Sequence, residues 1–280
     1  MALRFPTAAA GASLLALLLA AAPALPQEGP PKVPAREFFR GKVNSLEGRR
    51  ISLSYDFSEA AQSEDWRSTY PFVRPSVNGG WRVEGGALRG DGNAGYRHRA
   101  VFDGEVKVEA TLSSEDAKNF GVMILDEDRS VFNLCSLADT AFAMLDRKPP
   151  LMHQLTTFLP AGEGPGGSTE WRYIETSYEP RIGIKPVEVL VRKKGAMNEF
   201  RFGGTGRLAG ADKEAKVGPR LAPGFYTLGS RVVVTKVTVS GLLDAKWLRE
   251  SGVAFEDRSP ADPDPPIAGK EPDPAAPGAG

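Results

Sequence analysis

Cysteine is almost absent from this sequence, since Cys135 is the only one in 280 residues. An intramolecular disulfide and a metal site built on several thiolates are therefore excluded. The apolar run VFNLCSL surrounds Cys135, so we expect it to be a buried small side chain rather than a nucleophile. The two histidines, His98 and His153, lie too far apart in the chain to indicate a zinc site by themselves.

An excess of charge of either sign is also missing, because 35 Lys and Arg balance 35 Asp and Glu. Nucleic-acid binding uses a basic field, so we expect no nucleic-acid partner. A glycine-rich phosphate loop leading into a helix is not found either, which argues against a nucleotide ligand. We expect no cofactor, with a structural calcium ion as the one alternative.

Long apolar runs are lacking after the N-terminus, so no later segment is expected to cross a bilayer. The N-terminus itself has Arg4, an apolar run from Ala8 to Ala22, and small residues at Ala22-Pro23-Ala24. This pattern predicts a secretory signal peptide over residues 1–24, with a retained membrane anchor as the alternative. We therefore expect a secreted, periplasmic or cell-surface protein.

Glycine and proline are plentiful, at 31 and 23 residues, and many short segments alternate between apolar and polar side chains. Arg50–Phe57 and Glu105–Leu112 alternate with period two, and a valine-rich run at Val232–Val239 predicts a closing strand. Helical periodicity is almost absent; Leu242–Glu250 is expected to form one or two helical turns, with Leu243, Trp247 and Leu248 docked on the sandwich edge. These signals predict an all-β, antiparallel jelly-roll β-sandwich with a short terminal helix.

The domain prediction has four parts: a signal peptide at 1–24, a linker and N-terminal segment at 25–49, the sandwich at 50–250, and a tail at 251–280. The tail is rich in Pro, Ala, Asp and Gly, a composition that predicts disorder.

The order of several motifs resembles a known superfamily. W-x-V-x-x-G-x-L at Trp81–Leu88 is followed by F-x-G-x-x-K-V-x-A at Phe102–Ala110, by Gly121-Val122, and by V-x-V-x-V-x-x-x-G at Val187–Gly195. This series resembles the concanavalin A-like lectin/glucanase superfamily, closest to the laminin G-like and 3-keto-disaccharide hydrolase-like domains of secreted bacterial proteins. The resemblance implies a sandwich of two large sheets, often with a sugar-binding concave face.

The sequence departs from the glucanases of that superfamily. The E-x-D-x-E and E-x-D-x-x-E patterns of their catalytic strand are not found in a predicted strand here. Retaining glycosidases need two carboxyl groups about 5 Å apart, which positions i and i+2 of a strand can provide. Glu175 is the weak candidate for a catalytic carboxylate, and an enzyme is the less favoured expectation.

Aromatic side chains supply the candidate ligand contacts, because sugar rings stack on Trp and Tyr. Trp171 and Tyr173 are predicted to share a strand face with Glu175, after a glycine-rich loop. Trp66 and Tyr70 are predicted to lie in a loop, where binding residues often concentrate. For both pairs, a purely structural role is the alternative.

Charged side chains give two further candidates. Arg97 and Arg99 flank His98 in a predicted strand and could grip a carboxylate or an acidic sugar together, unless they form an ordinary solvated face. A loop at Asp126, Glu127 and Asp128 has the oxygen ligands that calcium takes, and Asp91 is another such residue.

The function expected from these features is an exported, non-catalytic sandwich that binds a carbohydrate or a cell-surface polymer. The alternatives are a glycoside hydrolase or lyase of the 3-keto-disaccharide hydrolase-like type, and a structural or protein-interaction module without a sugar site.

Overall fold

The computed structural model describes residues 32–69, 79–116, 119–128, 131–139, 151–159, 170–179, 185–212 and 217–269. The predicted signal peptide, residues 25–31, Tyr70 and residues 270–280 lie outside the described residues. No helix in the described part of the chain is long and apolar enough to cross a membrane.

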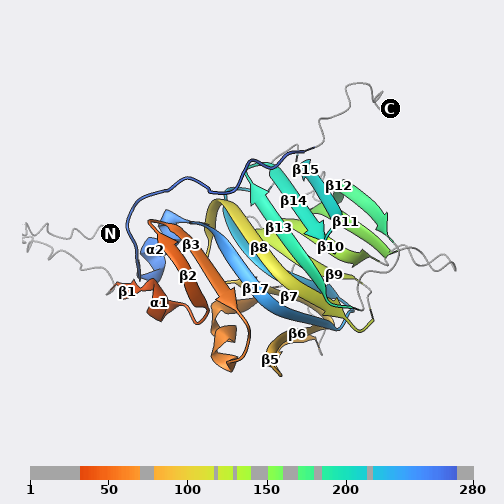
Figure 1. Cartoon of the computed structure of the whole chain (residues 1–280), viewed down its shortest axis with the longest axis horizontal. Helices are drawn as coiled ribbons and strands as arrows, with labels where there is room; N and C mark the ends of the chain where they lie inside the picture. The colour runs from red at the N-terminus through yellow and green to blue at the C-terminus, as the bar shows by residue number, and fades with distance from the viewer. Residues whose placement is uncertain are drawn as a thin grey trace, which may run out of the picture. The chain divides into compact units, whose positions relative to one another are not determined.

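Strands dominate the fold, as the alternating sequence pattern predicts (Figure 1). The strands before residue 120 are β1 (Val33–Pro34), β2 (Lys42–Glu47), β3 (Arg50–Tyr55), β4 (Trp66–Thr69), β5 (Gly80–Glu84), β6 (Ala87–Asp91), β7 (Asn93–His98), β8 (Phe102–Ser114) and β9 (Asn119–Asp126). The later strands are β10 (Phe132–Asp139), β11 (Leu151–Leu159), β12 (Glu170–Glu179), β13 (Val187–Lys194), β14 (Met197–Phe202), β15 (Gly206–Ala211), β16 (Arg220–Leu228), β17 (Val232–Leu243) and β18 (Val253–Ala254). The helices are α1 (Ala35–Phe38), the 3₁₀ turn η1 (Ala60–Asp65) and α2 (Ala245–Ser251).

The strands form two layers. One layer, here called the β8 sheet, has the order β15-β14-β13-β8-β17-β3-β2, with the β5–β6 hairpin paired to one end of β17. The other layer, the β9 sheet, has the order β12-β11-β10-β9-β16-β7-β4. A short pairing of β8 with β16 joins the layers at Phe102 and Leu221. The ladders within both layers are antiparallel, which confirms the predicted all-β jelly-roll sandwich.

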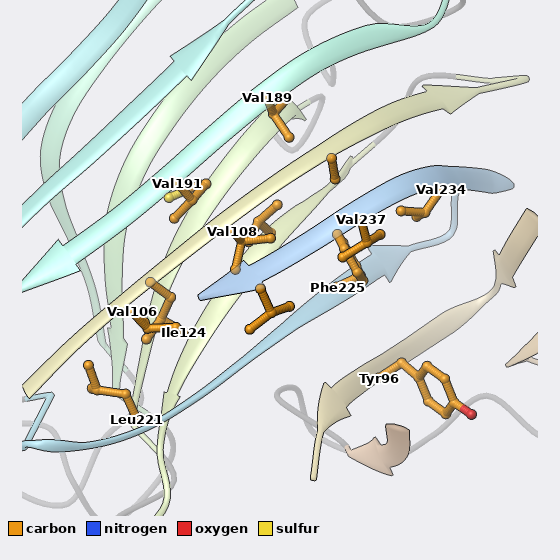
Figure 2. Close-up of a cluster of buried hydrophobic side chains, with 14 of the residues drawn as sticks. Tyr96, Val106, Val108, Ile124, Val189, Val191, Leu221, Phe225, Val234 and Val237 are labelled. Atoms are coloured by element: carbon orange, nitrogen blue, oxygen red, sulfur yellow. The ribbon is translucent and has the colours of Figure 1, made fainter. Parts of the chain in front are cut away.

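The main core lies between the layers, as Figure 2 shows. Val106 and Val108 of β8 and Val189 and Val191 of β13 point from one layer toward residues of the other, among them Phe225 of β16. From Val106 onward β8 buries every second residue, and β13 does so from Val187 to Val191, because successive side chains point to opposite faces. Cys135 is buried in the same core, as predicted.

The valine-rich strand β17 pairs with the upstream strand β3, but it lies inside the β8 sheet between β8 and β3, and one of its faces is only half-buried. A register shift between Thr235 and Thr238, with Lys236 at a positive φ of 51°, lets β17 pair first with β6 and then with β3. The predicted terminal helix is α2. Asp244 caps it by accepting a hydrogen bond from Trp247 N, and Leu248 is buried.

The tail from residue 251 differs from its prediction as far as residue 269. Val253 pairs in parallel with Val33, Ile267 is buried, and Asp262 is held by ion pairs on the β8 sheet. Its low hydrophobicity predicted disorder, but ion pairs with strands far away in the sequence give this stretch a fixed path. The amino-acid composition of the tail does not predict contacts with distant strands.

Candidate functional site

The edge strand β12 carries the exposed aromatic pair that the sequence singled out. Tyr173 lies opposite Thr156 and Trp171 lies opposite Phe158 on β11, so both rings are on the outer face of the β9 sheet. Trp171 is 37% exposed and Tyr173 is 49% exposed. Among the described residues they are the exposed large aromatic side chains, and we call the pair the aromatic ledge.

The ledge rests on an apolar cluster that lies on the outer face, separate from the main core. The ring of Trp171 lies 4.5 Å from that of Phe158, centroid to centroid, at an interplanar angle of 55°. Phe158 belongs to a buried cluster with Met123, Leu125, Phe132, Leu134, Ala222 and Tyr226. The contact with Phe158 fixes the position of the Trp171 ring while part of the ring stays in solvent.

The polar groups near the ledge lie on the other face of β12 or beneath the outer surface. Arg172 and Glu170 form an ion pair of 2.9 Å on the inward face, opposite Thr157 and Leu159, and the buried hydroxyl groups of Tyr226 and Ser136 are hydrogen-bonded to each other. Thr156, the neighbour of Tyr173 across the ladder, is buried, and its Oγ1 has no hydrogen-bond partner among the described residues. The ledge itself therefore offers mainly ring faces, which suit the C–H face of a ligand.

A cavity of about 480 Å³ opens beside the ledge, between β12 and the edge of β15. Its volume is within the range of small-molecule sites. Its lining residues are Thr157, Glu170, Arg172, Tyr173, Ile174, Ala211 and Asp212.

Glu175 does not share the face of the ledge, so that prediction is wrong. The register shifts between Thr156 and Leu155, which leaves Ile174 as an extra residue and places Glu175 opposite the inward-facing Leu155. Its Oε2 accepts a hydrogen bond from the backbone N–H of Ala209 at 2.5 Å, which ties β12 to β15. Simple alternation could not reveal the bulge.

Trp66 is also placed differently from its prediction. It is the first residue of β4 rather than a loop residue, and only 4% of it is exposed. Its ring stacks on Tyr96 and meets His98 and Tyr55 edge-on. Trp66 is therefore a core residue and unavailable to a ligand.

A buried polar network lies under Trp66. The Tyr55 hydroxyl donates to Asp65 at 2.9 Å and lies 2.7 Å from His98 Nε2. Burial, and then the nearby Arg99 charge, lower the pKa of His98 to about 3, while burial and the Asp65 carboxylate raise the pKa of Tyr55. These groups lie in the core with no exposed surface on His98 or Asp65, so the network is structural.

Arg97 and Arg99 do not act together, contrary to prediction. Strand β7 ends at His98, and Arg99 turns to pair with Asp65 at 2.7 Å and to lie 3.9 Å over the Phe38 ring. Arg97 stays on the outer face and pairs with Glu127 at 2.5 Å. Each guanidinium binds a carboxylate of the protein, and the two side chains do not lie on one strand face.

The acidic residues at 126–128 are not arranged as a set of calcium ligands. Asp126 is buried and accepts hydrogen bonds from the backbone N–H groups of Asp128 and Gly218. Glu127 pairs with Arg97, and Asp128 pairs with Arg220. In the described ranges, no three His, Cys, Asp or Glu side chains are grouped as a metal site. Asp91 instead pairs with Arg82 at 3.0 Å.

One charged cluster was missed by the sequence reasoning. Arg50, Glu105, Arg192 and Lys194 converge on the outer face of the β8 sheet and meet Asp262. Charged residues at every second position of β8 and β13 were the available signal, but they resemble an ordinary solvated face.

Comparisons with known proteins found no sequence match and solved structures of low similarity. No protein-family model and no curated protein matches the sequence. A carbohydrate-binding module, CBM66 from Bacillus subtilis, aligns over 63% of this chain and 96% of its own, at 15% identity and a TM-score of 0.44. A Bacillus subtilis protein of unknown function with a galectin-like fold aligns over 72% of this chain and 99% of its own, at 14% identity and a TM-score of 0.49.

A Crh5 transglycosylase in complex with NAG aligns over 77% of this chain and 96% of its own, at 10% identity and a TM-score of 0.48. All three scores are low, so the fold assignment depends on the observed sheets and any function on the site itself.

Proposed function

We propose that this chain is an exported protein that binds a glycan or a similar cell-surface polymer at the aromatic ledge, without cleaving it. The observation that carries the proposal is the exposure of Trp171 and Tyr173 side by side on one face of an edge strand. Large aromatic rings cost free energy in contact with water, so a fixed, exposed pair beside a cavity favours a ligand-binding role.

The chemistry of the ledge suits a saccharide. Positions i and i+2 of a strand are about 6.6 Å apart, so two rings can contact a ligand at two adjacent points. The C–H face of a sugar would stack on the rings, while Glu170 and Arg172 lie on the opposite face of β12 and line the neighbouring cavity. Tyr173 is shared between the ledge and the neighbouring cavity, so a bound polymer could continue from one into the other.

Cleavage is less well supported because the acidic groups are in the wrong places. Glu175 faces inward and is held by Ala209 N, and Glu170 is paired with Arg172. A glycosidase requires two carboxyl groups flanking one bond. The export part of the proposal rests on the sequence of the N-terminus, with Arg4, the apolar run and Ala22-Pro23-Ala24.

The test is binding of the protein to a panel of polysaccharides and glycans, compared with its Trp171→Ala and Tyr173→Ala variants. Loss of one stacking ring should weaken binding by about 1–2 kcal/mol, which is roughly tenfold in Kd. Leu46→Ala is the matched control, since Leu46 is 42% exposed on β2 of the other sheet and its variant should bind normally.

Thermal unfolding of each variant separates lost binding from lost structure. If folded Trp171→Ala and Tyr173→Ala bind as well as the parent, the ledge is not the site. If no glycan binds at all, the interaction-module alternative replaces the proposal. If sugar is released from a bound polymer, the non-catalytic part of the proposal is wrong.

A further inference from the structure

The C-terminal segment at residues 257–269, here called the strap, crosses the outer face of the β8 sheet after leaving α2 (Figure 1, dark blue). Arg49 donates to Ser259, and Arg50 donates to the carbonyl oxygen of Pro260. Near the far end, Arg207 donates to the carbonyl oxygen of Ala268. The strap is therefore held near its start by Arg49 and Arg50, at the beginning of β3, and near its end by Arg207 of β15.

Asp262 is the most firmly bound residue of the strap. Its Oδ2 accepts hydrogen bonds of 2.9 Å from both Arg192 Nη2 and Lys194 Nζ, and Arg50 Nη1 lies 3.8 Å from Oδ1. The Asp262 side chain is 7% exposed. Burial alone would raise the pKa of Asp262, but the bonds from Lys194, Asp264 N and Arg192 hold it well below its usual range.

A second carboxylate of the strap, two residues later, also forms an ion pair with the sheet. Asp264 pairs with Lys107 of β8 at 2.9 Å, while Asp262 is held by β13. The intervening Pro263 restricts the backbone and donates no hydrogen bond, so recognition depends on the two acidic side chains and their spacing. The site thus binds an acid-proline-acid sequence through cations of two neighbouring strands.

Space remains beneath the strap. A cavity of about 200 Å³ lies between it and the sheet, lined by hydroxyl groups of Ser52, Thr238 and Ser240 as well as by the charged side chains. Pro263 and Asp264 form part of its wall. The sheet itself contributes four cations here, Arg50, Lys107, Arg192 and Lys194, against Glu105 and Glu109. Without the strap this surface would carry excess positive charge and attract an anionic ligand.

We propose that this surface is a recognition site for extended, acidic, proline-rich peptide segments, and that Asp262-Pro263-Asp264 is its resident ligand. A segment of the same chemistry from another chain would take the place of the strap once the strap is released. The sequence contains a second run with the same spacing of acids, Glu271-Pro272-Asp273-Pro274, so a second copy of this protein could supply one. This site is separate from the aromatic ledge, so the two proposals fail or succeed independently.

The experiment uses the full-length chain carrying Asp262→Asn and Asp264→Asn, which weakens the strap without shortening it. A fluorescent peptide with the sequence of residues 257–269 is titrated, and anisotropy is measured at low and high salt. The variant should bind the peptide at least tenfold more tightly than the parent, because the tethered strap of the parent competes at a high effective concentration. A peptide with both acids changed to Asn should not bind, and salt should weaken binding of the acidic peptide.

Two further variants make the result decisive. Adding Arg192→Gln to the weakened chain should abolish peptide binding, whereas Glu256→Gln, which changes an exposed acid just before the strap, should behave as the parent. If the Asp262→Asn/Asp264→Asn variant does not fold, Asp264→Asn alone releases only the Asp264 anchor and should give a smaller gain in peptide affinity. If the folded Asp262→Asn/Asp264→Asn variant binds the peptide no more tightly than the parent does, the proposal is overturned. Binding of polygalacturonate in preference to the peptide would also overturn it, in favour of an acidic polysaccharide.

Discussion

His98 and His153 illustrate how single residues are buried in this fold. His98 accepts a hydrogen bond from Ala100 N at Nδ1, and His153 packs on Phe202 with 4.2 Å between ring centroids. Both side chains are fully buried. Burial lowers the pKa of His98 to about 3 and that of His153 to about 4, so both rings are neutral in the folded protein at neutral pH.

These two histidines predict a dependence of stability on pH. In the unfolded chain they would titrate near pH 6.5, so below that pH the unfolded state takes up protons that the folded state does not. Stability should be complete above about pH 6.5 and should fall as the pH drops, by up to about 1.4 kcal/mol per pH unit for each histidine. Urea unfolding between pH 7 and pH 5 measures this slope.

The His153→Leu variant provides the control for that measurement. Leucine keeps an apolar side chain against Phe202 but cannot take up a proton, so the slope should fall by about half. An unchanged slope in a folded variant would mean that other groups cause the pH dependence.

Sequence patterns predicted individual residues well where one face of a strand decided the outcome. Cys135 and the alternating residues of β8 are buried as expected. The patterns were wrong for Trp66 and Glu175, because a 3₁₀ turn leading into β4 and a bulge in β12 determine where those side chains point. The bulge depends on the register with β11, and the burial of Trp66 depends on aromatic neighbours such as Tyr96 and His98.

At the scale of elements, the contact between β12 and β15 closes one side of the sandwich. These are the last strands of their respective sheets, and Glu175 of one accepts a hydrogen bond from the backbone of Ala209 in the other. Unpaired N–H groups of edge strands invite pairing with other chains, so a side chain that occupies one stabilises the edge.

We expect Glu175→Ala to loosen this edge. Loss of the acceptor should cost about 1–3 kcal/mol of unfolding free energy and leave the N–H of Ala209 without its partner. Hydrogen exchange should become faster in β15 while the central strand β8 stays protected. Glu188→Ala, at an exposed position of β13, is the comparison variant. Unchanged exchange in β15 would show that the hydrogen bond adds little to the closure.

Elements were predicted most successfully where alternation is regular, as in β3 and β8, and the Trp81–Leu88 motif lies in the β5–β6 hairpin around Gly85 and Gly86. Both glycines have a positive φ, of 61° and 70°, in a tight turn between Glu84 and Ala87. The order of strands within each sheet was beyond prediction, because neighbours such as β3 and β17 are far apart in the sequence.

Across the whole molecule, the strap links the end of the described chain to its beginning and middle. Asp262 joins Arg50 of β3 to Arg192 and Lys194 of β13. The carboxylate and Arg192 are nearly buried, so solvent screens their interaction less than that of an exposed pair.

Asp262→Asn should therefore lower the unfolding free energy by about 2 kcal/mol, because it leaves two cations without their shared carboxylate. Asp257→Asn should change it little, since the Asp257 side chain is 77% exposed and lies 4.0 Å from Arg49. Denaturant unfolding of both variants makes the comparison. Equal effects would mean that the strap contributes no specific stabilisation.

The parallel pairing of β1 with β18 has a mechanical consequence. Val33 and Val253 are partners, and Val33 N donates to the carbonyl oxygen of Gly252 at 2.8 Å. If tension pulled residue 32 and residue 269 apart, the ion pairs of the strap would peel away first. The force would then load β1 and β18 in shear, because parallel neighbours pulled from opposite ends slide along each other. Only after both had yielded would the load reach β3 and β17, so the sandwich would be the last part of the described chain to feel the pull.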